Sequence, residues 1–117
     1  MSKSIVTKYE QFCLICGSPT TERHHLLMGN KHRHLAEDDG LVCGLCPKHH
    51  NSSNMSVHMN KEMKALSQQI AQLAWEKDYL AKKLANVNKD GLDEQSVEEW
   101  YSEAREAFRS RYGESFL

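Results

Sequence analysis

The sequence of 117 residues predicts a small α+β protein, because two kinds of segment follow one another along it. Residues 21–27 and 40–46 are short segments of strand length, and the stretch between them contains Gly29. From Asn60 onward, apolar residues recur at 3-4 spacing, which is the period of a helix packed on one face. All seven histidines and all four cysteines lie between positions 13 and 58. We therefore expect a Cys/His module followed by a helical part.

The expected Cys/His module comprises residues 1–59 and begins with a polar lead-in. Its two short segments, 21–27 and 40–46, are predicted to pair as a hairpin, with residues 28–39 as the loop between them. A short helix is expected to start at Pro47, since proline is tolerated in a first turn, with Cys46 or the residue before it as the cap. The following NSSN sequence favours a break, because Ser and Asn side chains compete for backbone hydrogen bonds.

The helical part, residues 60–117, is expected to belong to the same folding unit. Asn60 caps a helix predicted over about 60–86, and at 1.5 Å per residue about 25 residues span about 38 Å. Lys77 interrupts an apolar stripe that is expected to pack in the core or to form the seam of a homodimer. The stripe consists of Met63, Leu66, Ile70, Leu73, Leu80 and Leu84.

A last helix is predicted over about 97–112. Ser96 and Glu99 have the spacing of a capping box at its start, and Gly113 is expected to close it. Its aromatic residues and Trp75 of the preceding helix are expected in the core, and the alternative for one of them is to stack on a nucleobase. The predicted inner face comprises Val97, Trp100, Tyr101, Ala104 and Phe108.

The composition favours a thin core that a metal stabilises. Hydrophobic residues make up 39% of the chain, and a small domain with little apolar material often needs a disulfide or a structural metal. The N-terminus, MSKSIVTKYEQF, lacks the apolar region of a signal peptide, and no apolar run approaches the length of a membrane span. We therefore expect an intracellular chain, in which thiols stay reduced and CxxC pairs bind metal.

Cys13 and Cys16 form a CxxC turn that is followed by a glycine, which is the shape of a zinc knuckle. Such a turn lets two thiolates reach one ion at about 2.3 Å. The second ligand pair has two candidates, Cys43 with Cys46 or Cys46 with His49. We favour the second, because Cys46 lies at the start of the expected helix and His49 lies in its first turn. Cys43 lies inside the expected strand, where a thiol acts as a small buried hydrophobic residue.

The remaining histidines indicate a second metal site beside a proton acceptor. His24 and His25 are adjacent on an expected strand and therefore point to opposite faces. One could hold a divalent ion while the other takes a proton from water, a role that suits an imidazole with a pKa near neutrality. This division of labour fits phosphodiester hydrolysis, in which an ion stabilises the charge on the phosphate and a neutral imidazole activates the nucleophile.

The charge distribution places any contact with phosphate in residues 1–64. That segment holds eight Lys/Arg against six Asp/Glu, a balance of +2, whereas residues 65–117 hold seven against ten, a balance of −3. The planar guanidinium of Arg33 suits a phosphate, and the alternative is a salt bridge to Glu37, four residues further on. Two neighbouring histidines are expected in solvent or on phosphate: His32 and His34.

Together these motifs resemble the HNH (His-Me finger) endonucleases, and most closely the small phage-type HNH proteins. The resemblance implies a treble-clef zinc fold that carries a ββα-metal site, and a metal-dependent DNA endonuclease as the activity. It also implies a phage- or prophage-encoded protein in the cytoplasm of a bacterial host cell. Residues 84–100 look like an extension of the family pattern. The shared segments are CLIC (13–16), HHLLMGNKHRH (24–34), GLVCGLCPKHH (40–50), SVHMN (56–60) and FRSRYGESFL (108–117).

By position, the resemblance assigns the structural zinc to Cys13, Cys16, Cys46 and His49. It implies that His25 is the general base. The catalytic ion, Mg²⁺, Mn²⁺ or Ni²⁺, would lie on His24, His50 and His58.

Three points of this assignment stay open. His50 could take the zinc in place of His49, and Asn54 competes with His58 as the last ligand of the second ion. The family's middle Asn is missing: its place falls near Gly40 or Leu41, where only a backbone carbonyl could orient the base.

Three functions follow from these observations. The leading one is a DNA endonuclease with His25, Arg33 and one divalent ion in its active site. The second is a catalytically silent zinc module that binds nucleic acid or a partner protein, which the net charge of −1 and the missing Asn favour. The third is an inhibitor that mimics DNA with its acidic C-terminal half. It ranks last, because ten acidic residues are mixed with seven basic ones there.

Overall fold

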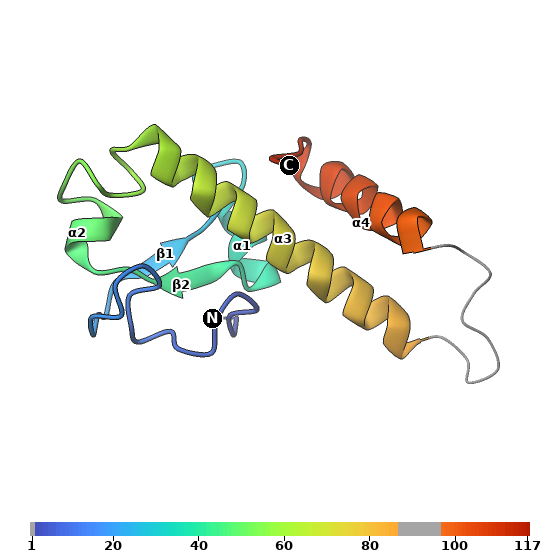
Figure 1. The fold of residues 1–117 in the computed structure, drawn as a ribbon, viewed down its shortest axis with the longest axis horizontal. Helices are drawn as coiled ribbons and strands as arrows, with labels where there is room; N and C mark the ends of the chain where they lie inside the picture. The colour runs from blue at the N-terminus through green and yellow to red at the C-terminus, as the bar shows by residue number, and fades with distance from the viewer. Residues whose placement is uncertain (1, 87–96) are drawn as a thin grey trace.

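A two-stranded sheet and a set of helices form the fold in the computed structural model, which describes residues 2–86 and 97–117 (Figure 1). The prediction of an α+β fold is therefore confirmed. The elements follow in the order β1 (Arg23–His25), α1 (Arg33–Asp39), β2 (Val42–Gly44), α2 (Pro47–His50), α3 (Lys61–Ala85) and α4 (Val97–Tyr112).

The predicted hairpin is present, although each strand has three residues and is shorter than the segment that predicted it. β1 and β2 are antiparallel, and His24 lies opposite Cys43 in their register. The N-terminal CxxC turn joins this sheet, since Cys13 forms a parallel bridge to Gly44. A side chain at Gly44 would meet the carbonyl oxygen of Phe12 at 2.8 Å, so only glycine lets the turn lie this close to β2.

The predicted loop at residues 28–39 is wrong in its second half, which forms α1. Gly40 ends this helix in the left-handed conformation, with φ 74°, and its N–H donates to the carbonyl of Glu37 at 3.3 Å. Ala36 is fully buried and anchors the helix on the core. A seven-residue helix gains its stability from such packing, so local sequence alone gave little indication of it.

The predicted starts of α2 and α3 are confirmed. Cys46 is the N-cap of α2, and Pro47 occupies the first turn. Asn60 is the N-cap of α3, and its Oδ1 accepts hydrogen bonds from the N–H groups of Glu62 and Met63 at 3.0 Å each. α3 has 25 residues, as predicted. Among the helices in residues 2–86 and 97–117, none combines the length and the apolar character needed to cross a membrane.

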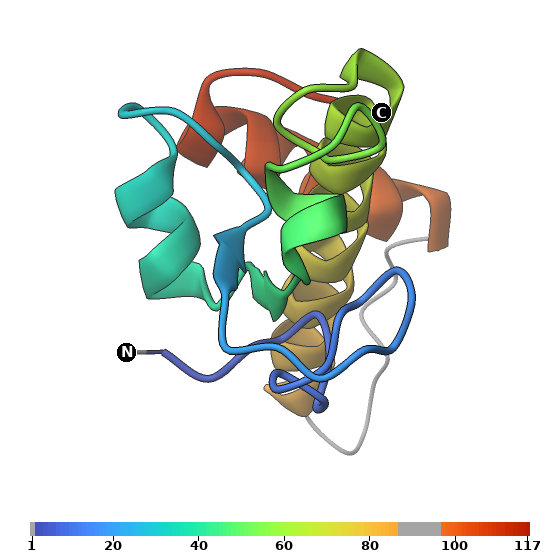
Figure 2. The same ribbon diagram turned by 90° about the vertical axis from the view of Figure 1, so that its left-hand side faces the viewer.

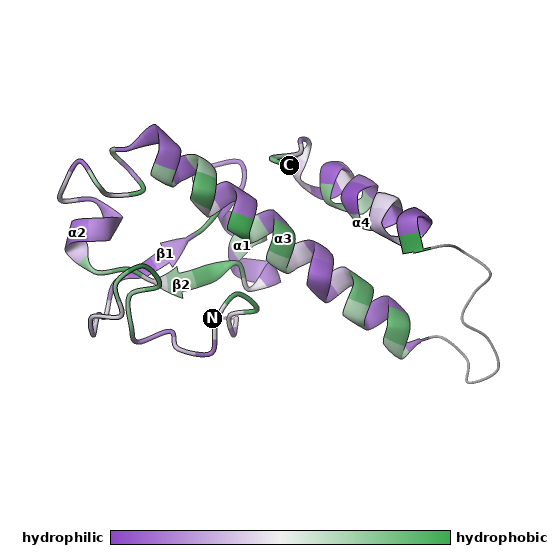
Figure 3. Ribbon diagram, in the orientation of Figure 1, coloured by the Kyte–Doolittle hydropathy of each residue, from purple (hydrophilic) through white to green (hydrophobic). Residues whose placement is uncertain are grey.

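The face of α3 that packs on the module differs from the predicted stripe. Ser67 and Ala71 are buried, and Ile70 and Trp75 pack against the same core. The buried residues of α3 are thus partly small or polar, and part of the apolar stripe faces solvent instead. Figure 3 shows hydrophobic and hydrophilic residues alternating along α3. The prediction that the whole stripe packs in the core is therefore wrong. Three of its leucines are largely exposed: Leu66 (46%), Leu73 (55%) and Leu84 (53%).

α4 runs along α3 (Figure 1), and its residues Phe108 and Tyr112 are buried, with the Phe108 ring edge-on to Trp75 of α3. The predicted inner face is wrong at Val97 and Tyr101, each of which is 60% exposed. Near its N-terminal end α4 contacts α3 through Glu103, which accepts hydrogen bonds from Tyr79 and Lys83. The face of α4 that carries Val97 and Tyr101 is exposed to solvent.

The two ends of α4 compare differently with the sequence prediction. Gly113, with φ 83°, closes the helix as predicted, and its N–H donates to the carbonyl of Arg109 at 2.8 Å. Ser96 of the expected capping box lies outside the described residues.

Asp39 joins α1 to both long helices. Figure 2 shows the backbones of these three helices from the side. Its Oδ2 accepts hydrogen bonds from the Trp75 indole at 3.0 Å and from the Tyr112 hydroxyl at 2.6 Å. Arg111 adds a bidentate ion pair to the same carboxylate. Burial, together with this carboxylate, raises the pKa of Tyr112, so the phenol stays protonated and donates. The Cys/His module and the helical part therefore share one core, and α1 is held on it.

Candidate metal centres and active site

Three cysteines and one histidine from separate parts of the chain meet beside α2. The ligand atoms of Cys13, Cys16, Cys46 and His49 all lie within 4.8 Å of one another. Sγ of Cys46 lies 3.7 Å from Sγ of Cys16 and 3.3 Å from Nδ1 of His49. Tetrahedral coordination at about 2.3 Å would place two sulfur ligands about 3.8 Å apart. The cluster could therefore hold a metal ion, and its donor atoms suit zinc.

Local structure holds these four ligands in place. The CxxC turn is closed by a hydrogen bond from the N–H of Gly17 to the carbonyl of Cys13 at 2.8 Å. Cys46 is the N-cap of α2 and His49 lies one turn on, so both face the CxxC turn. A hydrogen bond from Ser18 lowers the pKa of Cys16 to about 6, which favours the thiolate that a metal requires.

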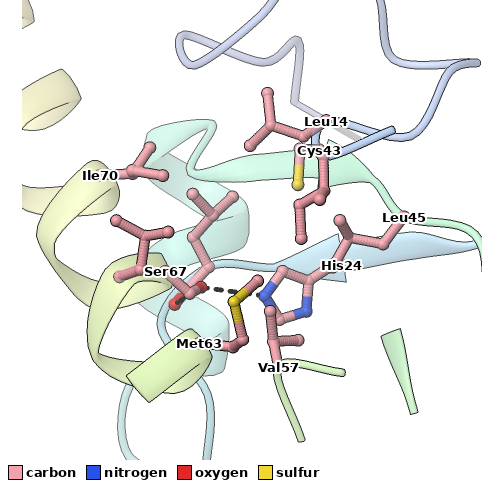
Figure 4. A pocket seen from close by; sticks show the side chains of 11 residues that line it. Leu14, His24, Cys43, Leu45, Val57, Met63, Ser67 and Ile70 are labelled. Atoms are coloured by element: carbon pink, nitrogen blue, oxygen red, sulfur yellow. Dashed lines mark hydrogen bonds between the residues drawn. The ribbon is translucent and has the colours of Figure 1, made fainter. Parts of the chain in front are cut away.

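Cys43 is not part of this cluster. It is buried in β2 opposite His24, and burial raises the pKa of its thiol to about 12. Figure 4 shows it in an apolar pocket with Leu14 and Leu45, where a neutral thiol is expected. Of the two ligand pairs that the sequence left open, the structure brings Cys46 and His49 together with the CxxC turn.

A second cluster consists of His24, His50 and His58, whose ligand nitrogens also lie within 4.8 Å of one another. His24 comes from β1 and His50 from the end of α2. The chain then folds back, with the N–H of His58 donating to the carbonyl of His50 at 3.3 Å. Asn54 is exposed, and its backbone carbonyl accepts a hydrogen bond from the side-chain amide of Asn60. Three imidazoles thus converge on one point.

The hydrogen bonds of Ser67 determine which nitrogen of His24 faces this cluster. The Ser67 hydroxyl donates its hydrogen to the carbonyl of Leu26 at 2.8 Å, so its oxygen can only accept from Nε2 of His24, 3.0 Å away (Figure 4). His24 therefore carries its hydrogen on Nε2 and keeps the lone pair of Nδ1 for an ion. Burial, together with the charges of the neighbouring histidines, lowers the pKa of His24 to about 3.

Glu22 gives His50 the corresponding arrangement. Its Oε1 lies 3.0 Å from Nδ1 of His50, and an ionised carboxylate can only accept, so Nδ1 carries the hydrogen. Nε2 of His50 is then free to bind an ion, and such outer carboxylates orient ligand histidines in many metal sites. Sequence analysis missed both Glu22 and Ser67. Glu22 precedes His24 by two residues and so shares its side of an extended chain, a signal that could have found it.

His25 and Arg33 face the same cleft as the second cluster. The cleft has a volume of about 310 Å³ and opens between β1, α1 and α2. Nε2 of His25 lies 3.0 Å from Oε1 of Glu37. Arg33 is exposed and has no ion-pair partner within the described part of the chain, because Glu37 pairs with Arg23. The alternative of an Arg33–Glu37 salt bridge is therefore wrong. The cleft is lined by Arg23, His24, His25, Met28, Gly29, Asn30, Arg33, His50 and His58.

The two loop histidines have different surroundings. His32 is 8% exposed, so the expectation that it lies in solvent or on phosphate is wrong. Its Nε2 lies 3.2 Å from Oε2 of Glu114, and its ring packs edge-on against Tyr112. His34 is exposed and lines a second hollow beside Arg33. His32 therefore holds the C-terminal segment, while His34 remains on the open side of α1.

The chain matches no protein-family model, no curated protein and no solved structure.

Proposed function

We propose that this protein is a metal-dependent DNA endonuclease of the HNH type. The observation that carries the proposal is the meeting of His25, Arg33 and a three-histidine cluster in one cleft. Hydrolysis of a phosphodiester needs a proton acceptor for water, a cation on the phosphate and a means of stabilising the leaving oxygen. Residues suited to each role line this cleft.

The proposed structural ion is zinc on Cys13, Cys16, Cys46 and His49. Three thiolates and one imidazole at tetrahedral spacing favour zinc over calcium and magnesium, which prefer oxygen ligands. A CxxC turn packed on a hairpin, followed by a helix that supplies the second ligand pair, supports the treble clef as the fold of this module.

The proposed second ion binds His24, His50 and His58. Their hydrogen bonds to Ser67 and Glu22 leave bare nitrogens on two of them, as a ligand set requires. Imidazole ligands suit Ni²⁺ better than Mg²⁺, so of the three expected ions Mg²⁺ is the weakest candidate. When bound, the ion would stabilise the charge that develops on the phosphate and the leaving oxygen.

In this proposal, His25 accepts the proton of the attacking water and Arg33 binds a phosphate of the DNA backbone. His25 is partly exposed in the cleft, so water reaches it. Arg33 projects from α1 at the rim of the same cleft, where its planar guanidinium can bind two phosphate oxygens. His25 and Arg33 both belong to residues 1–64, which have a net charge of +2, and not to the acidic C-terminal half.

Plasmid nicking tests the proposal. The zinc-loaded protein is incubated with supercoiled DNA and Ni²⁺, Mn²⁺ or Mg²⁺, with and without EDTA. We expect cleavage that EDTA stops and that is weakest with Mg²⁺. Arg33→Ala should slow it, while Lys48→Ala removes an exposed cation of α2 and serves as the matched control. Equal nicking with EDTA present would contradict a metal-dependent enzyme.

A catalytically silent zinc module is the second candidate, because the net charge of −1 gives weak attraction to DNA. In that case the protein would load zinc at the Cys/His cluster and bind its partner without cutting DNA. The nicking assay separates the two functions, since only the endonuclease responds to the second ion.

A further inference from the structure

A carboxylate on α1 reaches His25 on β1, across the edge of the cleft. Oε1 of Glu37 lies 3.0 Å from Nε2 of His25, and Oε2 of Glu37 lies 2.8 Å from Nη2 of Arg23. We propose that Glu37 is a positioning residue that orients the imidazole of His25 and fixes its tautomer. This role goes beyond the proposed endonuclease function, and only its consequence for cleavage rests on that function.

The carboxylate of Glu37 is ionised and can only accept hydrogen bonds. Bonds from Arg23, followed by those from His25 and the N–H of Ser2, lower the pKa of Glu37 to about 2. Because the carboxylate cannot donate, the hydrogen of the neutral His25 ring must lie on Nε2. The lone pair of Nδ1 is then free to accept a proton from a water molecule in the cleft.

The rigidity of α1 makes this contact specific. Asp39, two residues after Glu37, is bonded to Trp75 and Tyr112 of the two long helices. Gly40 closes α1 immediately afterwards. The carboxylate is therefore held by the core and not by a mobile loop, and it supplies an acceptor for the base in a chain that lacks the family's middle Asn.

Glu10 offers a matched control for Glu37. Arg23 donates from Nη1 to Glu10 at 3.0 Å, so both carboxylates stabilise the same guanidinium. The Glu10 pair holds Arg23 without contributing to the hydrogen bond at Nε2 of His25, which goes to Glu37. Loss of Glu10 therefore reports what weakening the Arg23 network does by itself, and loss of Glu37 adds the effect on His25.

The test combines ¹⁵N NMR of the histidine rings with plasmid nicking, on the full chain loaded with zinc. At a pH where the ring is neutral, wild-type His25 should be the Nε2–H tautomer. Glu37→Ala should shift His25 toward a mixture of tautomers, while Glu10→Ala and Glu37→Gln, which keeps an acceptor oxygen, should retain Nε2–H. Nicking by Glu37→Ala should fall between about 10-fold, as for outer-shell carboxylates, and about 10⁴-fold, as for triad carboxylates. Ni²⁺ binding should stay unchanged, because Glu37 lies outside both clusters.

Several outcomes would overturn the role of Glu37. The role would be overturned if wild-type His25 is the Nδ1–H tautomer. This measurement needs no variant, so it decides the question even if Glu37→Ala does not fold. An unchanged tautomer in a folded Glu37→Ala would do so as well. Equal losses of nicking in Glu10→Ala and Glu37→Ala would assign the effect to Arg23. If wild-type protein cuts no DNA, the endonuclease proposal fails, and the tautomer measurement still decides the role of Glu37.

Discussion

Oγ of Ser67 lies 3.0 Å from Nε2 of His24, so a residue of the long helix α3 sets which nitrogen of a buried histidine faces the second cluster. The same hydroxyl donates to the carbonyl of Leu26, and this leaves it no hydrogen for His24. α3 is therefore more than a support for the Cys/His module. It completes the outer shell of a candidate metal site.

This relationship predicts that Ser67→Ala weakens the second ion without affecting zinc. The variant removes the acceptor that fixes Nε2–H, and loss of such outer-shell partners costs about 10- to 100-fold in metal affinity. Calorimetric titration of the zinc-loaded protein with Ni²⁺ measures the effect. Ser56→Ala is the matched control, because Ser56 is equally buried and its hydroxyl has no partner among the described residues. Equal Ni²⁺ affinity in wild type and Ser67→Ala would contradict the tautomer argument.

The zinc cluster predicts different results for two buried cysteines. Cys46→Ser should lose zinc and unfold the module, because metal binding supplies folding free energy in thin-core domains. Cys43→Ser should keep its zinc and lose only about 1–3 kcal/mol, the cost of a hydroxyl in an apolar site. Elemental analysis and thermal melts check both. A Cys43→Ser variant without zinc, together with a His49→Ala variant that keeps it, would show that the ligand set is wrong.

Glu37 predicts a defined dependence of stability on pH. Its pKa is lowered from 4.5 to about 2 in the folded protein, so the unfolded chain binds the proton first as pH falls. The stabilisation that Glu37 provides is thus complete above about pH 5 and is lost as pH falls toward 2. Urea unfolding should show wild type to be more stable than Glu37→Gln at neutral pH, with the difference shrinking below pH 4.5. A difference that stays constant or grows in acid would contradict this assignment.

The exposed leucines of α3 predict that charge is tolerated on one face of the helix and not on the other. Leu66→Asp and Leu73→Asp should change the free energy of unfolding by no more than about 0.5 kcal/mol, as at other surface sites. Ala71→Asp places a charge in the core and should prevent folding. A homodimer through this stripe stays a prediction. If the dimer forms, light scattering should give the leucine variants half the mass of the wild-type protein. An equal mass for wild type and variants would exclude this dimer interface.

Local signals in the sequence were sufficient for several parts of the fold. The start at Pro47 follows from a proline whose missing N–H is not needed in a first turn, and the structure has this start. The start after Asn60 follows from a side chain that accepts hydrogen bonds from the first backbone N–H groups, and the structure has it too. The paired strands follow from two segments of strand length. These features depend on neighbours within a few residues, so they could be predicted without knowledge of the tertiary structure.

Features that depend on distant contacts could not be predicted in this way. α1 is held by Ala36 in the core and by Asp39 on two other helices, and neither contact leaves a local signal. Periodicity indicated which residues of α3 share a face. It did not indicate that the face with Ser67 and Ala71 would be buried and that Leu66 would be exposed. The same limit explains why Ser67, which lies 43 positions from His24 in the sequence, was missed while the histidines were found.

Nicking by His25→Ala tests the central claim most directly. The cleft geometry predicts that loss of this base slows cleavage by about 10²–10⁴-fold, while zinc content, DNA binding and Ni²⁺ affinity stay those of wild type. Added Mn²⁺ should not restore the His25 variant, because its defect is in proton transfer, whereas His24→Ala should recover in part. His25→Ala that cuts like wild type, or fully zinc-loaded wild type that cuts no DNA with any divalent ion, would contradict the account.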